Sequence, residues 1–189
     1  MSPDPSGRTH TRLPRPGAGA PYDVVLLDRD GTLNALAPWY RTPDDFALLP
    51  GAVDAVARLT ATGCAIVVVT NQQGLATGRL TWAQLSAVNA RLIAEVEAAG
   101  GRIDDVRLCP HAADTCVCRK PAPGLLCALF DENPHVSRER SVMVGDAETD
   151  AAAATAAGVA FMRCEPTIGL AGVVDSLVDD ETGTIPSRW

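Results

Sequence analysis

The chain has 189 residues, of which 47% are hydrophobic, and a formal net charge of −7. This length supports one sizeable hydrophobic core, and the acidic balance argues against a nucleic-acid partner, because binding to duplex phosphates normally needs a basic face. No apolar run reaches the roughly 18 residues of a membrane-spanning helix, and residues 1–20 lack the apolar centre of a secretion signal, so we expect a cytoplasmic protein with no membrane partner.

Strands and helices alternate along the predicted chain. The expected strands are residues 22–27, 64–69, 106–108, 141–144 and 159–162, and the expected helices are 51–62, 81–99, 123–130 and 150–157. Thr81 is the expected N-cap of the second helix. This alternation indicates an α/β fold, a doubly wound parallel sheet with right-handed crossovers. We expect a disordered tail at residues 1–20, one domain at residues 21–178 and a C-terminal tail at residues 179–189.

Polar residues follow four of the predicted strands. They are Asp28 and Asp30, then Thr70, Asn71 and Gln72, then Cys109 and His111, and finally Gly145 and Asp146. Because the carboxyl ends of parallel strands share one edge of the sheet, these four segments should converge on one crevice. Two carboxylates spaced i, i+2 are unfavourable together unless a cation or an ionised substrate lies beside them. The sequence therefore predicts an active site at the end of the first strand.

Four potential metal ligands fall within ten residues. They are Cys109, His111, Cys116 and Cys118. Three thiols and one imidazole make a complete tetrahedral zinc set, and four protein ligands leave no open position, which favours a structural ion that shapes the loop before Arg119 and Lys120. The alternative is that these are incidental reduced cysteines.

Lys120 is the only lysine among the sixteen Lys and Arg residues, which indicates a need for a compact ammonium group there.

Four short motifs follow one another along the chain: Asp28-Arg29-Asp30-Gly31-Thr32, Thr70-Asn71, Lys120-Pro121 and Gly145-Asp146 with Asp150. In this order and spacing, they resemble the motifs of the haloacid dehalogenase (HAD) superfamily of phosphatases. The Thr-Asn-Gln triplet and the cysteine/histidine loop before Arg-Lys-Pro are similar to the group of D,D-heptose 1,7-bisphosphate phosphatases and histidinol-phosphatases. The resemblance covers about residues 22 to 165 and implies a HAD-like Rossmannoid fold with a zinc-binding loop and no large cap domain. The gap of four residues between His111 and Cys116 is shorter than in many similar enzymes.

The resemblance also implies roles for individual residues. Asp28 would be the nucleophile that forms an aspartyl phosphate, and Asp30 would act first as general acid and then as general base. Thr70 and Lys120 would hold phosphoryl oxygens. The implied magnesium ligands are Asp28, the backbone carbonyl of Asp30, and Asp146, with Asp150 in support. The expected substrate contacts are Arg29, Gly31, Thr32, Asn71, Gln72, Gln73 and Arg119, with the N–H groups of the Gly31–Thr32 turn exposed to the phosphate.

The expected function is magnesium-dependent hydrolysis of a small phosphorylated metabolite by a monomeric enzyme. A heptose 1,7-bisphosphate, converted to the 1-phosphate, is favoured because a second phosphate should meet the arginines near the crevice. These arginines are Arg29, Arg41, Arg79 and Arg119. Histidinol phosphate is the alternative, because Asp44 and Asp45 could approach its amine, and a non-catalytic zinc-stabilised binding module is an alternative from another class. Trp39 would either contact a sugar ring or anchor its loop as a hydrophobic plug.

Overall fold

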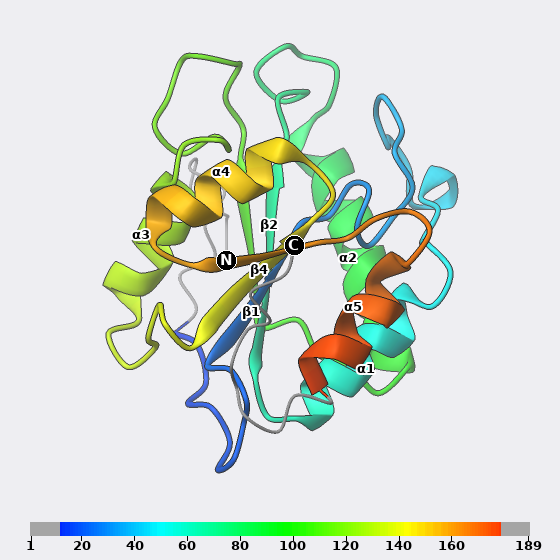
Figure 1. Cartoon of the computed structure of the whole chain (residues 1–189). Coiled ribbons are helices and arrows are strands. Elements are labelled where there is room, and N and C mark those ends of the chain that lie inside the picture. The colour runs from blue at the N-terminus through cyan, green and yellow to red at the C-terminus, as the bar shows by residue number, and fades with distance from the viewer. Residues whose placement is uncertain (1–11, 179–189) are drawn as a thin grey trace.

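The computed structural model describes residues 12–178 and has a five-stranded parallel sheet at its centre. The strands are β1 (Val24–Leu27), β2 (Ala65–Asn71), β3 (Asp105–Cys109), β4 (Ser141–Gly145) and β5 (Ala160–Arg163). Their order across the sheet is β3-β2-β1-β4-β5, so the chain winds outward in both directions from β1. The carboxyl end of β1 is therefore the topological switch point, where open α/β sheets bind their ligands. Figure 1 shows long loops rising from this edge of the sheet.

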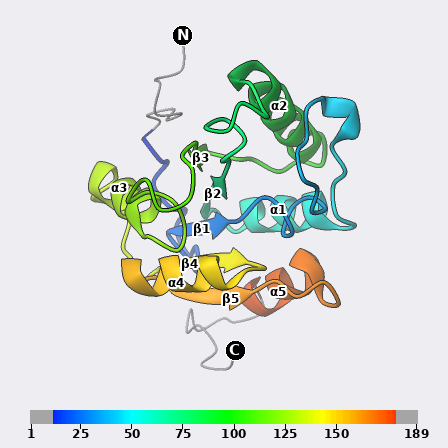
Figure 2. The same cartoon turned by 90° about the horizontal axis from the view of Figure 1, so that it is seen from above.

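Helices cover both faces of the sheet, as Figure 2 shows from above. One face carries α1 (Ala52–Ala61), α2 (Trp82–Ala98) and α5 (Gly169–Val178), and the other carries α3 (Gly124–Glu132) and α4 (Glu148–Ala157). A short 3₁₀ helix, η1 (Pro43–Asp45), lies in the loop before α1. The doubly wound α/β prediction is confirmed, and none of the described connections forms a large cap domain.

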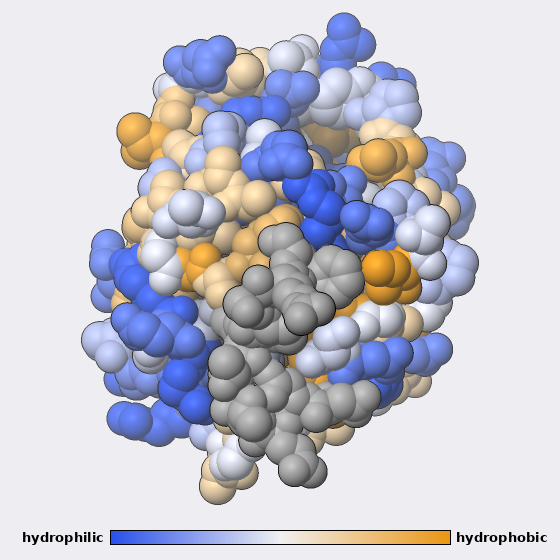
Figure 3. Space-filling model, in the orientation of Figure 1, coloured by the Kyte–Doolittle hydropathy of each residue, from blue (hydrophilic) through white to orange (hydrophobic). Residues whose placement is uncertain are grey.

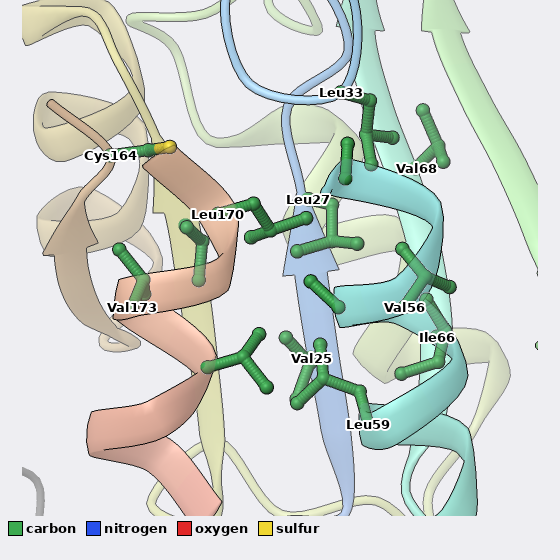
Figure 4. Packing of buried hydrophobic residues seen from close by; sticks show 14 of the residues in the cluster. Val25, Leu27, Leu33, Val56, Leu59, Ile66, Val68, Cys164, Leu170 and Val173 are labelled. Atoms are coloured by element: carbon green, nitrogen blue, oxygen red, sulfur yellow. The ribbon is translucent and has the colours of Figure 1, made fainter. Parts of the chain in front are cut away.

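The hydrophobic core has two halves, one on each face of the sheet. Val25 and Leu27 of β1 point toward α1 and α5, as Figure 4 shows, whereas Val24 and Leu26 pack on the α3 and α4 side. All four side chains are fully buried, which is typical of a parallel strand covered on both faces. Because side chains alternate along a strand, Asp28 and Arg29, which follow Leu27, also project toward opposite faces of the sheet.

Two helix starts are fixed by side-chain hydrogen bonds. Thr81 Oγ1 accepts from the Gln84 N–H at 3.2 Å and Gln84 Oε1 accepts from the Thr81 N–H at 2.9 Å, which confirms Thr81 as the N-cap of α2. At α4 the Asp150 carboxylate accepts from the Ala147 N–H at 3.1 Å. As a result, α4 begins at Glu148, two residues earlier than the sequence predicts, and Asp150 lies in its first turn.

Two segments differ from the sequence-based expectation. The helix α5 was not predicted, and its residues Leu170, Val173, Val174 and Leu177 are buried in the core. Residues 12–20, expected in a disordered tail, lie against the domain: Leu13 is buried, and its N–H donates to Asn133 Oδ1 at 2.8 Å. The rest of the expected tails, residues 1–11 and 179–189, lies outside the described residues.

Polar residues dominate the surface view in Figure 3, where hydrophobic residues form scattered spots. Within residues 12–178, no helix has the length and apolar character needed to cross a membrane.

Candidate active site

The end of β1 places Asp28 in a buried cluster of charges. Lys120 Nζ donates to Asp28 Oδ1 at 2.5 Å and to the Val69 carbonyl at 2.7 Å, and it lies 2.7 Å from Asp150 Oδ1. The Lys120 side chain is only 3% exposed, so its ammonium is fixed between the two carboxylates. These residues line a cavity of about 330 Å³ together with Asp30, Thr70, Asn71 and Asp146.

Burial strongly affects the ionisation of this cluster. Desolvation raises the pKa of Asp28 to about 7, against the lowering effect of the Lys120 ammonium and with a further rise from Asp150. Burial alone would lower the pKa of Lys120, but the carboxylates of Asp28 and Asp150 outweigh it and raise that pKa above its ordinary value. Lys120 is therefore charged at neutral pH, whereas Asp28 needs a further positive charge to stay fully ionised.

The carboxylates suit a hard divalent cation. One oxygen from each of Asp28, Asp146 and Asp150 lies within 4.8 Å of the others. Burial, followed by the charge of Asp150, raises the pKa of Asp146 above its ordinary value, and the lowering effect of the Lys120 ammonium does not outweigh them. A Cβ built on Gly31 would lie 2.2 Å from Asp146 Oδ2, so the absence of a side chain at Gly31 lets this carboxylate reach the backbone beside Asp30. An all-oxygen set at this position fits Mg²⁺.

Asp150 itself is already occupied by protein contacts. One of its oxygens lies against Lys120 and the other accepts from the Ala147 N–H. This geometry matches the expectation that Asp150 supports the site.

Four donors surround the carboxylate of Asp30. Arg29 Nη2 lies 3.0 Å from both oxygens, Asn34 Nδ2 donates to Oδ1 at 2.9 Å, and Gln72 Nε2 donates to Oδ2 at 2.8 Å. The Thr70 hydroxyl is a longer donor at 3.4 Å and also accepts from Gln72 Nε2. Asp30 is thus held at the edge of the cavity that Asp28 lines, with part of its side chain exposed.

Asn71 fixes the main chain of Lys120. Asn71 Nδ2 donates to the Lys120 carbonyl at 2.9 Å, and Asn71 Oδ1 accepts from the Lys120 N–H at 3.1 Å. The second strand and the loop before α3 are thereby joined, which places the ammonium over Asp28.

The Gly31–Thr32 turn differs from the expectation. The Gly31 N–H donates to the Asn34 carbonyl at 2.7 Å, and the Thr32 N–H donates to the Arg29 carbonyl at 3.4 Å. The prediction that these N–H groups face an incoming phosphate is therefore wrong for this conformation, because both are used inside the turn. The Thr32 side chain is fully buried. The role of these two residues in substrate binding stays a prediction.

A second cavity, of about 200 Å³, lies beside the first and also borders Asp30 and Asn71. Its other lining residues are Arg29, Ala37, Pro38, Trp39, Tyr40, Gln72, Gln73 and Arg119. The buried Nη1 of Arg119 has no hydrogen-bond partner within the described residues. This cavity therefore offers a guanidinium and amide groups to the part of a ligand that extends away from Asp28.

Trp39 joins two of the loops that border the second cavity. A Cβ on Gly74 would lie 2.7 Å from the Trp39 ring, and the Arg79 guanidinium lies 5.9 Å from the ring centroid. Trp39 thus anchors its loop and also lines the cavity, so both sequence-based readings of this residue fit the structure.

The cysteine/histidine loop between β3 and α3 brings its four ligands together. Cys118 Sγ lies 3.4 Å from Cys109 Sγ, 3.3 Å from Cys116 Sγ and 3.3 Å from His111 Nδ1. These separations are close to the edges of a tetrahedron around zinc, about 3.5 to 3.8 Å for its usual bond lengths. Burial raises the pKa of the Cys109 thiol to about 12, so a cation is what would make it a thiolate at neutral pH. The cluster is compatible with zinc and leaves no open ligand position.

Comparisons with known proteins agree with this geometry. The family model described as "HAD-hyrolase-like" matches residues 117–163. D-glycero-beta-D-manno-heptose-1,7-bisphosphate 7-phosphatase of Pseudomonas putida is 41% identical over 137 residues, which cover 71% of this chain and 78% of that protein. The Escherichia coli K12 protein of the same name is 36% identical over 144 residues, which cover 72% and 75% of the two chains. This chain belongs to the HAD superfamily of phosphatases.

A solved structure supports the same membership. The crystal structure of D,D-heptose 1,7-bisphosphate phosphatase from B. bronchiseptica, complexed with magnesium and phosphate, superposes with a TM-score of 0.77 at 31% identity. The match covers 84% of this chain and 99% of that one. As a HAD phosphatase, the chain is a phosphoric monoester hydrolase.

Three contacts of the HAD site were not found from the sequence. Asn34 and Asn89 reach the Asp30–Arg29 pair, and the Val69 carbonyl accepts from Lys120. Asn34 could have been found from its place four residues after Asp30 in a tight turn. Asn89 lies in the middle of α2 and gives no local signal, and a carbonyl contact depends on strand geometry alone.

Proposed function

We propose that the protein is a D-glycero-β-D-manno-heptose 1,7-bisphosphate 7-phosphatase. The observation that carries the proposal is the pair of adjoining cavities: one holds the Asp28–Lys120 centre, and the other presents Arg119 with an unpartnered, buried nitrogen. A bisphosphate bound across the two cavities places one phosphate group in each of them. The names of relatives at 36% and 41% identity support the same substrate and its β anomer.

In the first step, an oxygen of Asp28 attacks phosphorus, and the bond from phosphorus to the C7 oxygen breaks. Asp30 gives its proton to the departing oxygen, so the sugar leaves as an alcohol and Asp28 carries the phosphoryl group. Lys120 and Thr70 hold the phosphoryl oxygens as negative charge shifts onto them. Lys120 is well placed for this because its ammonium already lies 2.5 Å from Asp28 Oδ1.

In the second step, Asp30 is a carboxylate and takes a proton from a water molecule. The water oxygen forms a bond to phosphorus, the bond to Asp28 breaks, and phosphate leaves with both aspartates returned to their starting states. A Mg²⁺ ion held by Asp28, Asp146 and the Asp30 carbonyl would neutralise negative charge on the nucleophile and the phosphoryl group. The zinc ion that we assign to the cysteine/histidine cluster would be structural, because it would have four protein ligands.

Histidinol phosphate is the second candidate and is less favoured by the cavities. Its amine needs carboxylates, but Asp30 is the one carboxylate that lines the second cavity, and Arg29 already pairs with it. Asp44 and Asp45 lie in η1 and line neither cavity. The deciding measurement is kcat/KM for the β-heptose bisphosphate, its α anomer and histidinol phosphate with Mg²⁺ present. We expect the β anomer to be preferred; preference for histidinol phosphate would overturn the substrate assignment but leave the chemistry standing.

Two variants separate catalysis from mere binding. Asp28→Asn should remove turnover of every substrate while the far-ultraviolet circular dichroism spectrum stays unchanged, because only the nucleophilic oxygen is lost. Retained turnover would remove the covalent mechanism.

Arg119→Ala should raise KM for the bisphosphate more than KM for a sugar monophosphate, and equal effects on both would show that Arg119 does not bind the second phosphate. An absence of turnover by the wild-type enzyme on any phosphate ester would favour the binding-module alternative.

A further inference from the structure

Arg29 is a buried charge that the proposed chemistry does not use directly. Its side chain is 3% exposed and lies next to the nucleophile in sequence, yet on the opposite face of the sheet, toward α2. A buried guanidinium is unfavourable unless its donors find partners. The partners of Arg29 therefore indicate what the charge is used for.

The guanidinium lies between a reacting group and a helix. Nη2 is 3.0 Å from both carboxylate oxygens of Asp30, and Nη1 donates to Asn89 Oδ1 at 2.9 Å. Among the described residues, Nε has no hydrogen-bond partner. The orientation of the guanidinium thus depends on two contacts, one to Asp30 and one to the side chain of Asn89 in α2.

Asn89 is well placed to be a fixed anchor. It lies in the middle of α2, whose start is held by the Thr81 capping box, and its helix neighbours Val88 and Leu92 are fully buried in the core. Of the other donors to Asp30, Asn34 and Gln72 belong to loops at the edge of the sheet, and the Thr70 hydroxyl near the end of β2 is a long donor at 3.4 Å. Asn89 therefore connects the position of Asp30 to a rigid element of the fold.

We propose that Asn89 is a positioning residue for catalysis, which acts through Arg29 to hold the Asp30 carboxylate where it exchanges a proton with the leaving oxygen. The inference rests on the proposed role of Asp30 as general acid and base. Without the Asn89 acceptor, the guanidinium is free to turn, and the carboxylate that it holds is no longer fixed relative to the phosphoryl group. Proton transfer requires close approach of donor and acceptor, so this loss slows the steps that depend on it.

The dependence of rate on the leaving group gives a direct test. A sugar alkoxide needs a proton as it departs, whereas p-nitrophenolate is a stable anion and departs without one. Asn89→Leu keeps the branching and the number of heavy atoms of the side chain but lacks the acceptor. We compare kcat/KM, which covers the steps up to departure of the leaving group and excludes hydrolysis of the aspartyl phosphate, the step common to both substrates. We expect Asn89→Leu to lower kcat/KM for the heptose bisphosphate about tenfold or more while changing kcat/KM for p-nitrophenyl phosphate less than about threefold. Binding of both substrates should change little, because Asn89 lines neither cavity.

Asn89→Asp keeps an oxygen acceptor at the same position and should restore most of the lost kcat/KM. Ser86→Ala, an exposed polar position on the same helix, is the matched control and should match the wild type on both substrates. Should Asn89→Leu fail to fold, Asn89→Ala makes the same test with a smaller side chain. Equal losses of kcat/KM on the two substrates would assign Asn89 a packing role, and unchanged kcat/KM on both would show that Asp30 is held without it; either result overturns the inference.

Asp30→Asn separates this inference from the proposed function. It should lower kcat/KM for the sugar phosphate far more than kcat/KM for p-nitrophenyl phosphate. Equal losses in Asp30→Asn would mean that Asp30 is not the general acid, and the error would then lie in the proposed mechanism and not in the link from Asn89 to Arg29.

Discussion

At the scale of single residues, the site depends on Lys120, the only lysine of the chain. Its ammonium contacts two carboxylates and a backbone carbonyl within 2.7 Å while it is almost fully buried. A guanidinium is larger and planar, so it could not approach these three oxygens from one point. The geometry of these contacts therefore explains why residue 120 is a lysine in a chain whose other residues of this charge are arginines.

Lys120→Met should lower the free energy of unfolding by about 3 kcal/mol, because it leaves Asp28 and Asp150 buried without their counter-charge. Adding Asp150→Asn should recover part of that loss but none of the activity. Urea unfolding followed by circular dichroism measures both effects. Arg91→Met is the control, since its ion pair with Glu95 is exposed and contributes little. A loss no larger than that of the control would contradict a stabilising role for the buried pair.

The raised pKa of Asp28 predicts a pH dependence of stability in the absence of added Mg²⁺. The ordinary value is 3.8 and the value in the folded protein is about 7, so between these limits the folded state binds more protons than the unfolded state. Stability should therefore fall as pH rises from about 4 to 7, by at most about 1.4 kcal/mol per pH unit from this group. Urea midpoints at several pH values should fall less steeply for Asp28→Asn than for the wild type. Parallel slopes would show that Asp28 has no raised pKa.

The candidate catalytic residues were more predictable than the residues that hold them in place. Asp28, Asp30, Thr70, Lys120 and Asp146 stand in short motifs at strand ends, and the structure brings all five to one cavity. Asn89 acts across a tertiary contact, sixty positions from Arg29. No local pattern marks such a residue, because its partner is chosen by how α2 packs on the sheet.

At the scale of elements, the cysteine/histidine loop has little core of its own. Among its residues, Val117 is largely exposed and His111 and Asp114 are exposed as well, so few apolar contacts hold its shape. The loop nevertheless delivers Arg119 to one cavity and Lys120 to the other. A metal ion bound by the four ligands would fix the conformation of this loop, which few apolar contacts stabilise.

Cys116→Ala should reduce bound zinc from about one ion per chain to a small fraction, lower Tm by several degrees and lower kcat, because the loop that places Lys120 loses a ligand. Zinc content by mass spectrometry and a thermal melt measure the first two effects. Cys127→Ala, a thiol outside the cluster, should keep its zinc. Wild-type protein purified without chelators and free of zinc would contradict the site.

At the scale of the whole molecule, both chain ends of the described part contribute to the core. Leu13 belongs to the buried cluster on one face of the sheet, which also contains Phe130 and Val136, and Leu177 of α5 belongs to the cluster on the other face. Neither segment was assigned its structure from the sequence. Leu13 stands among Pro, Arg and Gly, and α5 contains two glycines, so the local sequence does not favour an ordered structure in either segment. Burial of their apolar side chains in the core stabilises both segments instead.

Leu13→Ala should lower the free energy of unfolding by about 2 to 3 kcal/mol, because it removes most of a buried side chain and leaves a cavity in the cluster to which Leu13 belongs. Urea unfolding measures this change. Leu36→Ala is the control for stability: that side chain is 72% exposed, and its loss should change the free energy by less than about 0.5 kcal/mol. Equal values for the two variants would mean that residues 12–20 do not stabilise the fold.

The alternation at the end of β1 sends Asp28 toward Lys120 and Asp150 on one face of the sheet and Arg29 toward Asn89 on the other. In the proposed mechanism, bond formation to phosphorus would therefore depend on contacts from the α3 and α4 side of the sheet, and proton transfer on contacts from α2 on the other side. Substitutions in α2 and in α4 should combine with additive effects on the activation free energy. An engineer could thus adjust proton delivery for a new leaving group from one layer while the nucleophile, held by the other, stays as it is.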